Sequence, residues 1–162
     1  MGELFENKVS KTMLMTLQAK ALEGSQKNRL FIDQKAEEMM KQVPSMVNVS
    51  FFDQIGVCLR TKYFDDCCKN FIESHKHPVI VQLGCGLDDR QGRIGAEDIP
   101  FFSVDFLDVI TLRQEFFEET ATSQMIANSI LDDKWIQIVK EQYPRGDYLF
   151  IIEGVLMLSL IH

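Results

Sequence analysis

The pattern of apolar and polar residues changes character near Pro78. Before this point, apolar residues recur three and four positions apart, which is typical of helices that bury one face. Asp33 stands where it can cap the second of these helices, and Pro44 follows that helix. The pattern therefore predicts three helices in the first part of the chain, over residues 11–23, 33–43 and 50–74.

After Pro78, short apolar runs alternate with longer helical or loop segments. The runs are apolar on both faces, as in parallel strands that helices cover on both sides of a sheet. Trp135 has helical spacing with Ile136 and Val139 and is expected to pack in the core. The predicted strands are residues 79–83, 101–104, 125–130 and 148–152. The predicted helices are residues 109–119 and 132–142.

These elements predict one α/β domain, with residues 1–77 as a helical cap and residues 78–162 as a parallel sheet with right-handed crossovers. The sheet is expected to be incomplete, because the chain stops after the fourth strand. An uncovered apolar edge promotes association. We therefore expect poor stability of the isolated chain, self-association, or pairing with a complementing C-terminal half.

Composition narrows the class of protein. Of the 162 residues, 46% are apolar and 25% charged, as in ordinary globular domains. The net charge of -7 argues against binding to nucleic acid, which requires a basic surface. We expect no secretory signal, no membrane span and no metal site, because neither the apolar runs nor the cysteine and histidine spacings fit one. A cytoplasmic protein with reduced thiols is predicted.

A glycine turn follows the first predicted strand, in the segment VIVQLGCGLDDR. Gly84 and Gly86 allow the backbone to turn sharply and to approach a ligand without a Cβ clash. A third glycine at the dinucleotide spacing is missing, since Gly95 is too distant, which disfavours an NAD-binding oxidoreductase. A tight turn without a ligand is the alternative.

Two acids end later strands. Asp105 follows the turn by about 20 residues, the spacing at which an acid accepts hydrogen bonds from ribose hydroxyls. Its alternative is to cap a helix beginning at Phe106. Glu153 ends the last strand, where it could meet a ligand ammonium or bond to local backbone N–H groups.

Arg60 lies on the apolar stretch of the longest predicted helix. A guanidinium can pair bidentately with a ligand carboxylate. Taken alone, the sequence favours the other interpretation, a surface arginine whose stem covers apolar neighbours.

Four segments together resemble the leucine carboxyl methyltransferase family, including bacterial O-methyltransferases similar to those of polyketide biosynthesis. They are RTKYFDD at 60–66, LGCGLDDR at 83–90, VDFLDVITLR at 104–113 and IEGVLML at 152–158. The resemblance implies a Rossmann-like class I methyltransferase fold that binds S-adenosylmethionine. It also implies methyl transfer to a carboxylate or hydroxyl of a small molecule or of a protein C-terminus.

The resemblance assigns the methionine end of the cofactor to four residues. Arg60 would hold its carboxylate, and Glu153 would lie near its amino group. Gly84 and Gly86 would pass close to the methionine portion. No catalytic residue is assigned, since a carboxylate acceptor is already ionised and needs no base.

The nucleoside end falls to three residues. Asp105 would take the ribose hydroxyls. Ser129 and Ile130 stand where family members often carry Asp-Leu against the adenine, so a hydroxyl replaces a charged acceptor there. Because the chain stops early, a non-catalytic remnant that keeps only the cofactor half-site is the alternative to an active methyltransferase.

Overall fold

The computed structural model describes residues 11–42 and 48–153. Two compact units are present in the chain. The helical unit contains the described residues up to Cys67 together with Leu87–Gly95, and the sheet unit contains Cys68–Gly86 and the described residues from Ala96 onward. The chain therefore leaves the sheet unit directly after Gly86 and returns to it at Ala96.

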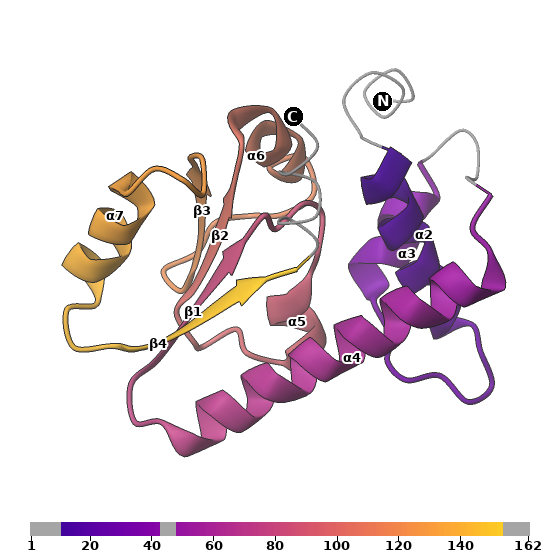
Figure 1. Ribbon diagram of the computed structural model, residues 1–162, viewed down its shortest axis with the longest axis horizontal. Helices are drawn as coiled ribbons and strands as arrows, with labels where there is room; N and C mark the ends of the chain where they lie inside the picture. Colours follow the sequence, from indigo (N-terminus) through magenta and orange to yellow (C-terminus); the bar gives the residue numbers. More distant parts are fainter. Residues whose placement is uncertain (1–10, 43–47, 154–162) are drawn as a thin grey trace. The chain divides into compact units, whose positions relative to one another are not determined.

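The sheet unit is built on four parallel strands in the order β3-β2-β1-β4 (Figure 1). This order confirms the predicted parallel α/β sheet. β1 lies inside the sheet and is buried at every position after its first residue, which explains its unbroken apolar run. The strands are β1 Pro78–Leu83, β2 Phe101–Asp105, β3 Ser123–Ala127 and β4 Asp147–Ile152.

Two helices accompany these strands, α6 Leu107–Arg113 and α7 Lys134–Gln142. Trp135 and Val139 of α7 are buried in the main hydrophobic cluster, which confirms the predicted core role of Trp135. Full burial of one such side chain contributes roughly 1.5–3 kcal/mol. The strand residues of the cluster are Val79, Val81, Leu83, Phe102, Val104 and Ile126.

The helical unit contains α2 Lys11–Gly24, α3 Gln34–Met40, α5 Arg90–Ile94 and the first two-thirds of α4 Phe51–Ser74 (Figure 1). Asp33 caps α3 as predicted, because its carboxylate accepts a hydrogen bond of 2.9 Å from the Ala36 N–H. Gly95 ends α5 with a left-handed φ of 68°, a conformation that glycine adopts at little cost.

The structure differs from the sequence prediction at three elements. Helix α5 was not predicted, because five residues are too few to show a helical period. The helix expected over 109–119 is α6, which begins at Leu107 and ends at Arg113. The strand expected over 125–130 ends at Ala127, where its partner Asp105 ends β2 and no further ladder position exists.

Candidate functional site: the carboxyl edge of the sheet

Strand register brings three of the predicted site residues to one edge of the sheet. Leu83 of β1 pairs with Val104 of β2 and with Ile152 of β4. Gly84, Asp105 and Glu153 each come directly after one of these paired residues, and Glu153 is half-buried there. This is the edge at which open α/β sheets bind their ligands.

The turn after β1 has the left-handed backbone that requires glycine. Gly84 has a φ of 69° and Gly86 a φ of 51°. The N–H groups of Gly84 and Cys85 both donate to the Val104 carbonyl, at 2.8 and 3.3 Å, which ties the turn to the end of β2. The structure thus confirms the sharp turn that the two glycines predicted.

Asp105 is bonded to this turn. Its Oδ2 accepts a hydrogen bond of 2.8 Å from the Gly86 N–H, and its Oδ1 accepts one of 2.8 Å from the Phe106 N–H. The alternative that Asp105 is the helix N-cap is wrong, because Phe106 is the N-cap residue of α6 and the Phe106 side chain makes no capping hydrogen bond. An ionised carboxylate has about four acceptor positions, so Asp105 keeps room for further donors.

Opposing effects act on the pKa of the Asp105 carboxyl group. Its partial burial raises the pKa of the carboxyl group, and the nearby charge of Asp108 raises it further. The N–H groups of Gly86 and Phe106 and the charge of Arg113 lower the pKa, but burial prevails and the pKa stays above the ordinary value. Asp105 therefore gains a proton more readily than an exposed aspartate does.

Ser129 and Ile130 lie in the connection between β3 and α7, not in the strand that the sequence predicted. The Ser129 Oγ accepts a hydrogen bond of 3.3 Å from the Leu131 N–H. Ile130 packs against the hydrophobic core, and its carbonyl accepts from the Trp135 Nε1 at 3.3 Å. The connection leaves β3 beside Asp105.

Two residues of this edge were missed by sequence reasoning. The Asn128 N–H donates to the Asp105 carbonyl at 2.9 Å, which joins the β3–α7 connection to the end of β2. The Arg113 Nη1 donates to the Gly86 carbonyl at 3.1 Å. Arg113 stands in the segment VDFLDVITLR, but nothing in its spacing distinguishes a buried arginine from an exposed one.

Arg60, the residue expected to hold the cofactor carboxylate, is an exposed residue of α4 in the helical unit. The glycine turn belongs to the sheet unit, so the contact between Arg60 and a cofactor stays a prediction. The next residue of the motif RTKYFDD, Thr61, is fully buried, and so is Asp65. The motif therefore presents Arg60 and Asp65 to different environments.

Asp65 belongs to a buried ion cluster that links the motif RTKYFDD to the motif LGCGLDDR. Its carboxylate bonds to Arg90 at 2.7 Å and to Arg93 at 2.6 Å. Arg93 also pairs with Asp33 at 2.7 Å and with Asp88 at 2.9 Å. These side chains are at most 8% exposed, so Asp65 of the first motif and Asp88 and Arg90 of the second serve the packing of the helical unit.

Asp88 shows the strength of this cluster. Burial alone would raise the pKa of its carboxyl group, but the charges of Arg93, Lys20 and Arg90 outweigh burial and hold the pKa well below the usual range. The Lys20 Nζ lies 2.5 Å from the Asp88 carboxylate. Asp88 is therefore ionised throughout the ordinary pH range.

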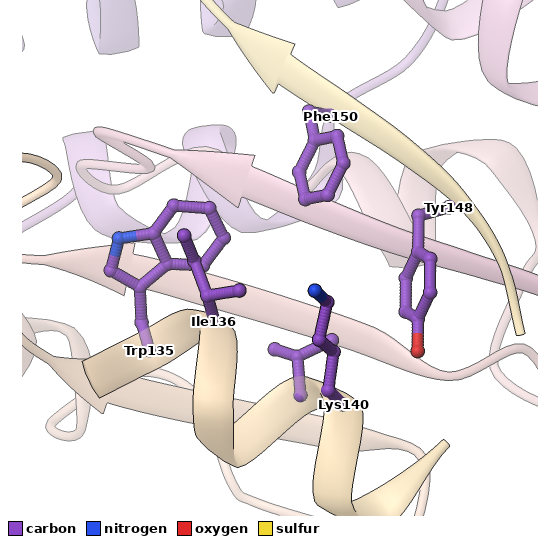
Figure 2. A pocket seen from close by; sticks show the side chains of 6 residues that line it. Trp135, Ile136, Lys140, Tyr148 and Phe150 are labelled. Carbon is purple, nitrogen blue, oxygen red and sulfur yellow. The ribbon is translucent and has the colours of Figure 1, made fainter. Parts of the chain in front are cut away.

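An apolar groove lies between α7 and β4 (Figure 2). Its volume of about 20 Å³ admits roughly one water molecule, which is far too small for a nucleoside cofactor. Phe150 stands over the groove and is 49% exposed. The lining residues are Trp135, Ile136, Val139, Lys140, Tyr148 and Phe150.

The part of the chain that the structure describes was compared with the requirements of metal sites and of membrane-spanning helices. Within residues 11–42 and 48–153, no group of His, Cys, Asp and Glu side chains could hold a metal ion. In the same ranges, no helix is both long and apolar enough to cross a membrane.

Comparisons with known proteins agree with this architecture. The family model for leucine carboxyl methyltransferase matches residues 11–158. The tetracenomycin polyketide synthesis O-methyltransferase TcmP of Streptomyces glaucescens is 31% identical over 151 residues, which are 91% of this chain and 55% of that protein. The S-adenosyl-L-methionine-dependent methyltransferase dpfgK of Gibberella zeae is 27% identical over 154 residues, 84% of this chain and 51% of that protein.

This chain thus spans about half the length of the curated relatives it matches. The family match covers most of the described sheet and helices. The chain belongs to the leucine carboxyl methyltransferase family, and its parallel sheet is that of a Rossmann-like methyltransferase with a helical N-terminal part.

Proposed function

We propose that this member of the leucine carboxyl methyltransferase family binds S-adenosylmethionine at the carboxyl edge of its sheet. As part of an O-methyltransferase, it would transfer the methyl group to a carboxylate or hydroxyl oxygen. The observation that carries the proposal is the bond between the Gly86 N–H and the Asp105 carboxylate, which joins the left-handed turn to the predicted ribose acceptor.

The residues of this edge fit such a cofactor. Side chains are absent at Gly84 and Gly86, so the methionine portion can approach the backbone closely. Asp105 keeps acceptor positions for two ribose hydroxyls, and Glu153 supplies a negative charge beside the turn for an ammonium group. The cofactor would supply an electrophilic methyl group, while the protein would position it and limit access of water.

Three further residues complete the proposed site. Arg60 would pair with the cofactor carboxylate, because a guanidinium fork matches the geometry of a carboxylate. Ser129 would offer its hydroxyl to the adenine, and Ile130 would contribute an apolar contact there. These assignments rest on the family resemblance of the positions.

The acceptor is proposed to be a small molecule. The name of TcmP places that relative in polyketide synthesis, which favours a small acceptor over a protein C-terminus. A carboxylate acceptor needs no general base, since it is already ionised near neutral pH, whereas a hydroxyl would need one. We also propose a reducing, cytoplasmic setting; it is supported by the four cysteines, none of which forms a disulfide with another described residue.

The edge strand β4 is proposed to be an association surface. β4 forms the edge of the described sheet, and Phe150 and Ile152 are 49% and 40% exposed on it. An apolar strand edge of this kind favours pairing with another strand. Its occupant would be a complementing C-terminal half, as the greater length of the relatives suggests, or a second copy of this chain.

Calorimetric titration with S-adenosylhomocysteine, the demethylated cofactor, tests the proposal. Binding by the 162-residue chain should be lost in Asp105→Ala and weakened in Arg60→Ala. Asp98→Ala is the matched control, because Asp98 is exposed and follows the helical unit by three residues. A folded chain that does not bind, or binding that survives Asp105→Ala, would contradict the proposed site and favour a remnant without cofactor.

A further inference from the structure

Arg113 ends α6 with its guanidinium turned into the protein. Only 6% of the residue is exposed. Its Cζ lies 4.0 Å from the centre of the Phe117 ring, a cation–π contact that holds the guanidinium in place. Its Nη1 donates a hydrogen bond of 3.1 Å to the Gly86 carbonyl.

The Gly86 residue is therefore held on both of its peptide groups. Asp105 Oδ2 accepts from its N–H at 2.8 Å, and Arg113 Nη1 donates to its carbonyl at 3.1 Å. Both partners belong to the sheet unit, as does Gly86 itself. A left-handed residue such as Gly86 has no side chain to restrict it, so these two bonds define its orientation.

We infer that Arg113 is a positioning residue, which fixes the glycine turn through the Gly86 carbonyl and so keeps the Gly86 N–H directed at the Asp105 carboxylate. This inference deepens the proposed cofactor site and rests on it for its consequence in binding. Arg113 would not touch the cofactor; it would act through the Gly86 carbonyl and through its charge.

The charge argument can be followed around Asp105. Burial raises the pKa of its carboxyl group, and Asp108 on the first turn of α6 raises it further. The N–H groups of Gly86 and Phe106 lower the pKa most, and Arg113, at the other end of α6, adds a smaller lowering through its positive charge. Without Arg113, the pKa of Asp105 would rise further, and a protonated carboxyl group would donate through its O–H and offer fewer acceptor positions to the ribose hydroxyls.

A purely structural arginine would not have these effects. An arginine needed only for packing could be replaced by Met, which is similar in length and fills apolar space. Arg113→Met removes both the charge and the donor, whereas Arg113→Lys keeps the charge and loses the planar fork. Comparing the two variants therefore separates the effect of the Arg113 charge from the effect of its hydrogen bond to Gly86.

The experiment is NMR on the free protein with these two variants. In Arg113→Met, the pKa of the Asp105 carboxyl should rise, and the Gly86 amide should exchange with solvent at least about tenfold faster, as loss of one charged hydrogen bond implies. In Arg113→Lys, the pKa should stay near that of the unmodified protein. Arg145→Met is the matched control, because Arg145 is exposed on the connection before β4 and should change neither quantity.

Titration with S-adenosylhomocysteine separates this inference from the proposed function. Affinity should fall about tenfold in Arg113→Met and less in Arg113→Lys. If the NMR changes occur but the unmodified protein binds no cofactor, the positioning role stands and the proposed function fails. If the unmodified protein binds and Arg113→Met alters neither the Asp105 pKa nor the affinity, the inference is overturned. If Arg113→Met does not fold, Arg113→Lys decides. Faster exchange of the Gly86 amide in Arg113→Lys, with an unchanged Asp105 pKa, supports the positioning role, and unchanged exchange of that amide refutes it.

Discussion

Removal of the Arg93 guanidinium is expected to destabilise the helical unit strongly. The side chain is 1% exposed and lies within 3 Å of carboxylate oxygens from Asp33, Asp65 and Asp88. Arg93→Met fills similar space but leaves these buried acids with one cation fewer. Breaking a buried ion pair by removing one partner costs about 3–5 kcal/mol.

The remaining ion pairs of the cluster set the expected loss of unfolding free energy within this range. Asp65 keeps its bond to Arg90, and Asp88 keeps Lys20. Asp33 has no second ion pair among the described residues but still caps α3. We therefore expect a loss near the lower end of the range, about 3 kcal/mol. That is a large share of the roughly 5–15 kcal/mol by which domains are usually stable.

Urea unfolding followed by circular dichroism measures the effect. The midpoint should fall sharply with little change in slope, because the surface exposed on unfolding is nearly the same. The urea midpoint of Arg93→Lys should lie between those of the unmodified protein and Arg93→Met, since lysine keeps the positive charge but lacks the planar guanidinium group. A loss below about 1 kcal/mol in Arg93→Met would refute the view that this cluster holds the helical unit together, because exposed ion pairs contribute that little.

Four further outcomes are expected. Gly86→Ala should weaken binding of S-adenosylhomocysteine in calorimetry and cost about 1–2 kcal/mol in urea unfolding, because its φ of 51° is strained for alanine. The folded-state pKa of Asp88 lies below its unfolded pKa of about 3.9, so ionised Asp88 should stabilise the protein fully above that pH and less as the pH falls further. The urea midpoint of Asp88→Asn should therefore depend less on pH in acid than that of the unmodified protein. Affinity for S-adenosylhomocysteine should fall on acidification at a pH above the ordinary aspartate pKa, since the Asp105 pKa is raised, and Asp105→Asn should bind weakly without this dependence. Phe150→Lys should reduce any dimer or complex seen by light scattering, while Lys140→Ala in the same groove should not.

The sequence predicted the sheet well because its signals are local. The apolar run of β1, the two glycines and the acid that ends β2 lie in short windows where period and turn chemistry are readable. The family resemblance then supplied the fold, which the parallel sheet confirms.

The contacts inside the motifs could not be predicted in the same way. Asp65 meets Arg90 and Arg93 across a separation of at least 25 residues, and no periodicity reports such a pairing. Arg113 resembles a surface arginine in sequence, and only the path of α6 brings it to the Gly86 carbonyl. The sequence therefore identified the motif residues, but only the structure shows which of them lie at the carboxyl edge of the sheet and which belong to the buried ion cluster.

The order of the strands also bears on how the protein is made. β1 pairs with β2 soon after it along the chain, but its other neighbour is β4, with Pro78 opposite Asp147. On the ribosome, β1 would thus present an open apolar edge until β4 has been synthesised, because sequence-distant pairings form late. Nascent chains paused between β3 and β4 should therefore be the most dependent on chaperones.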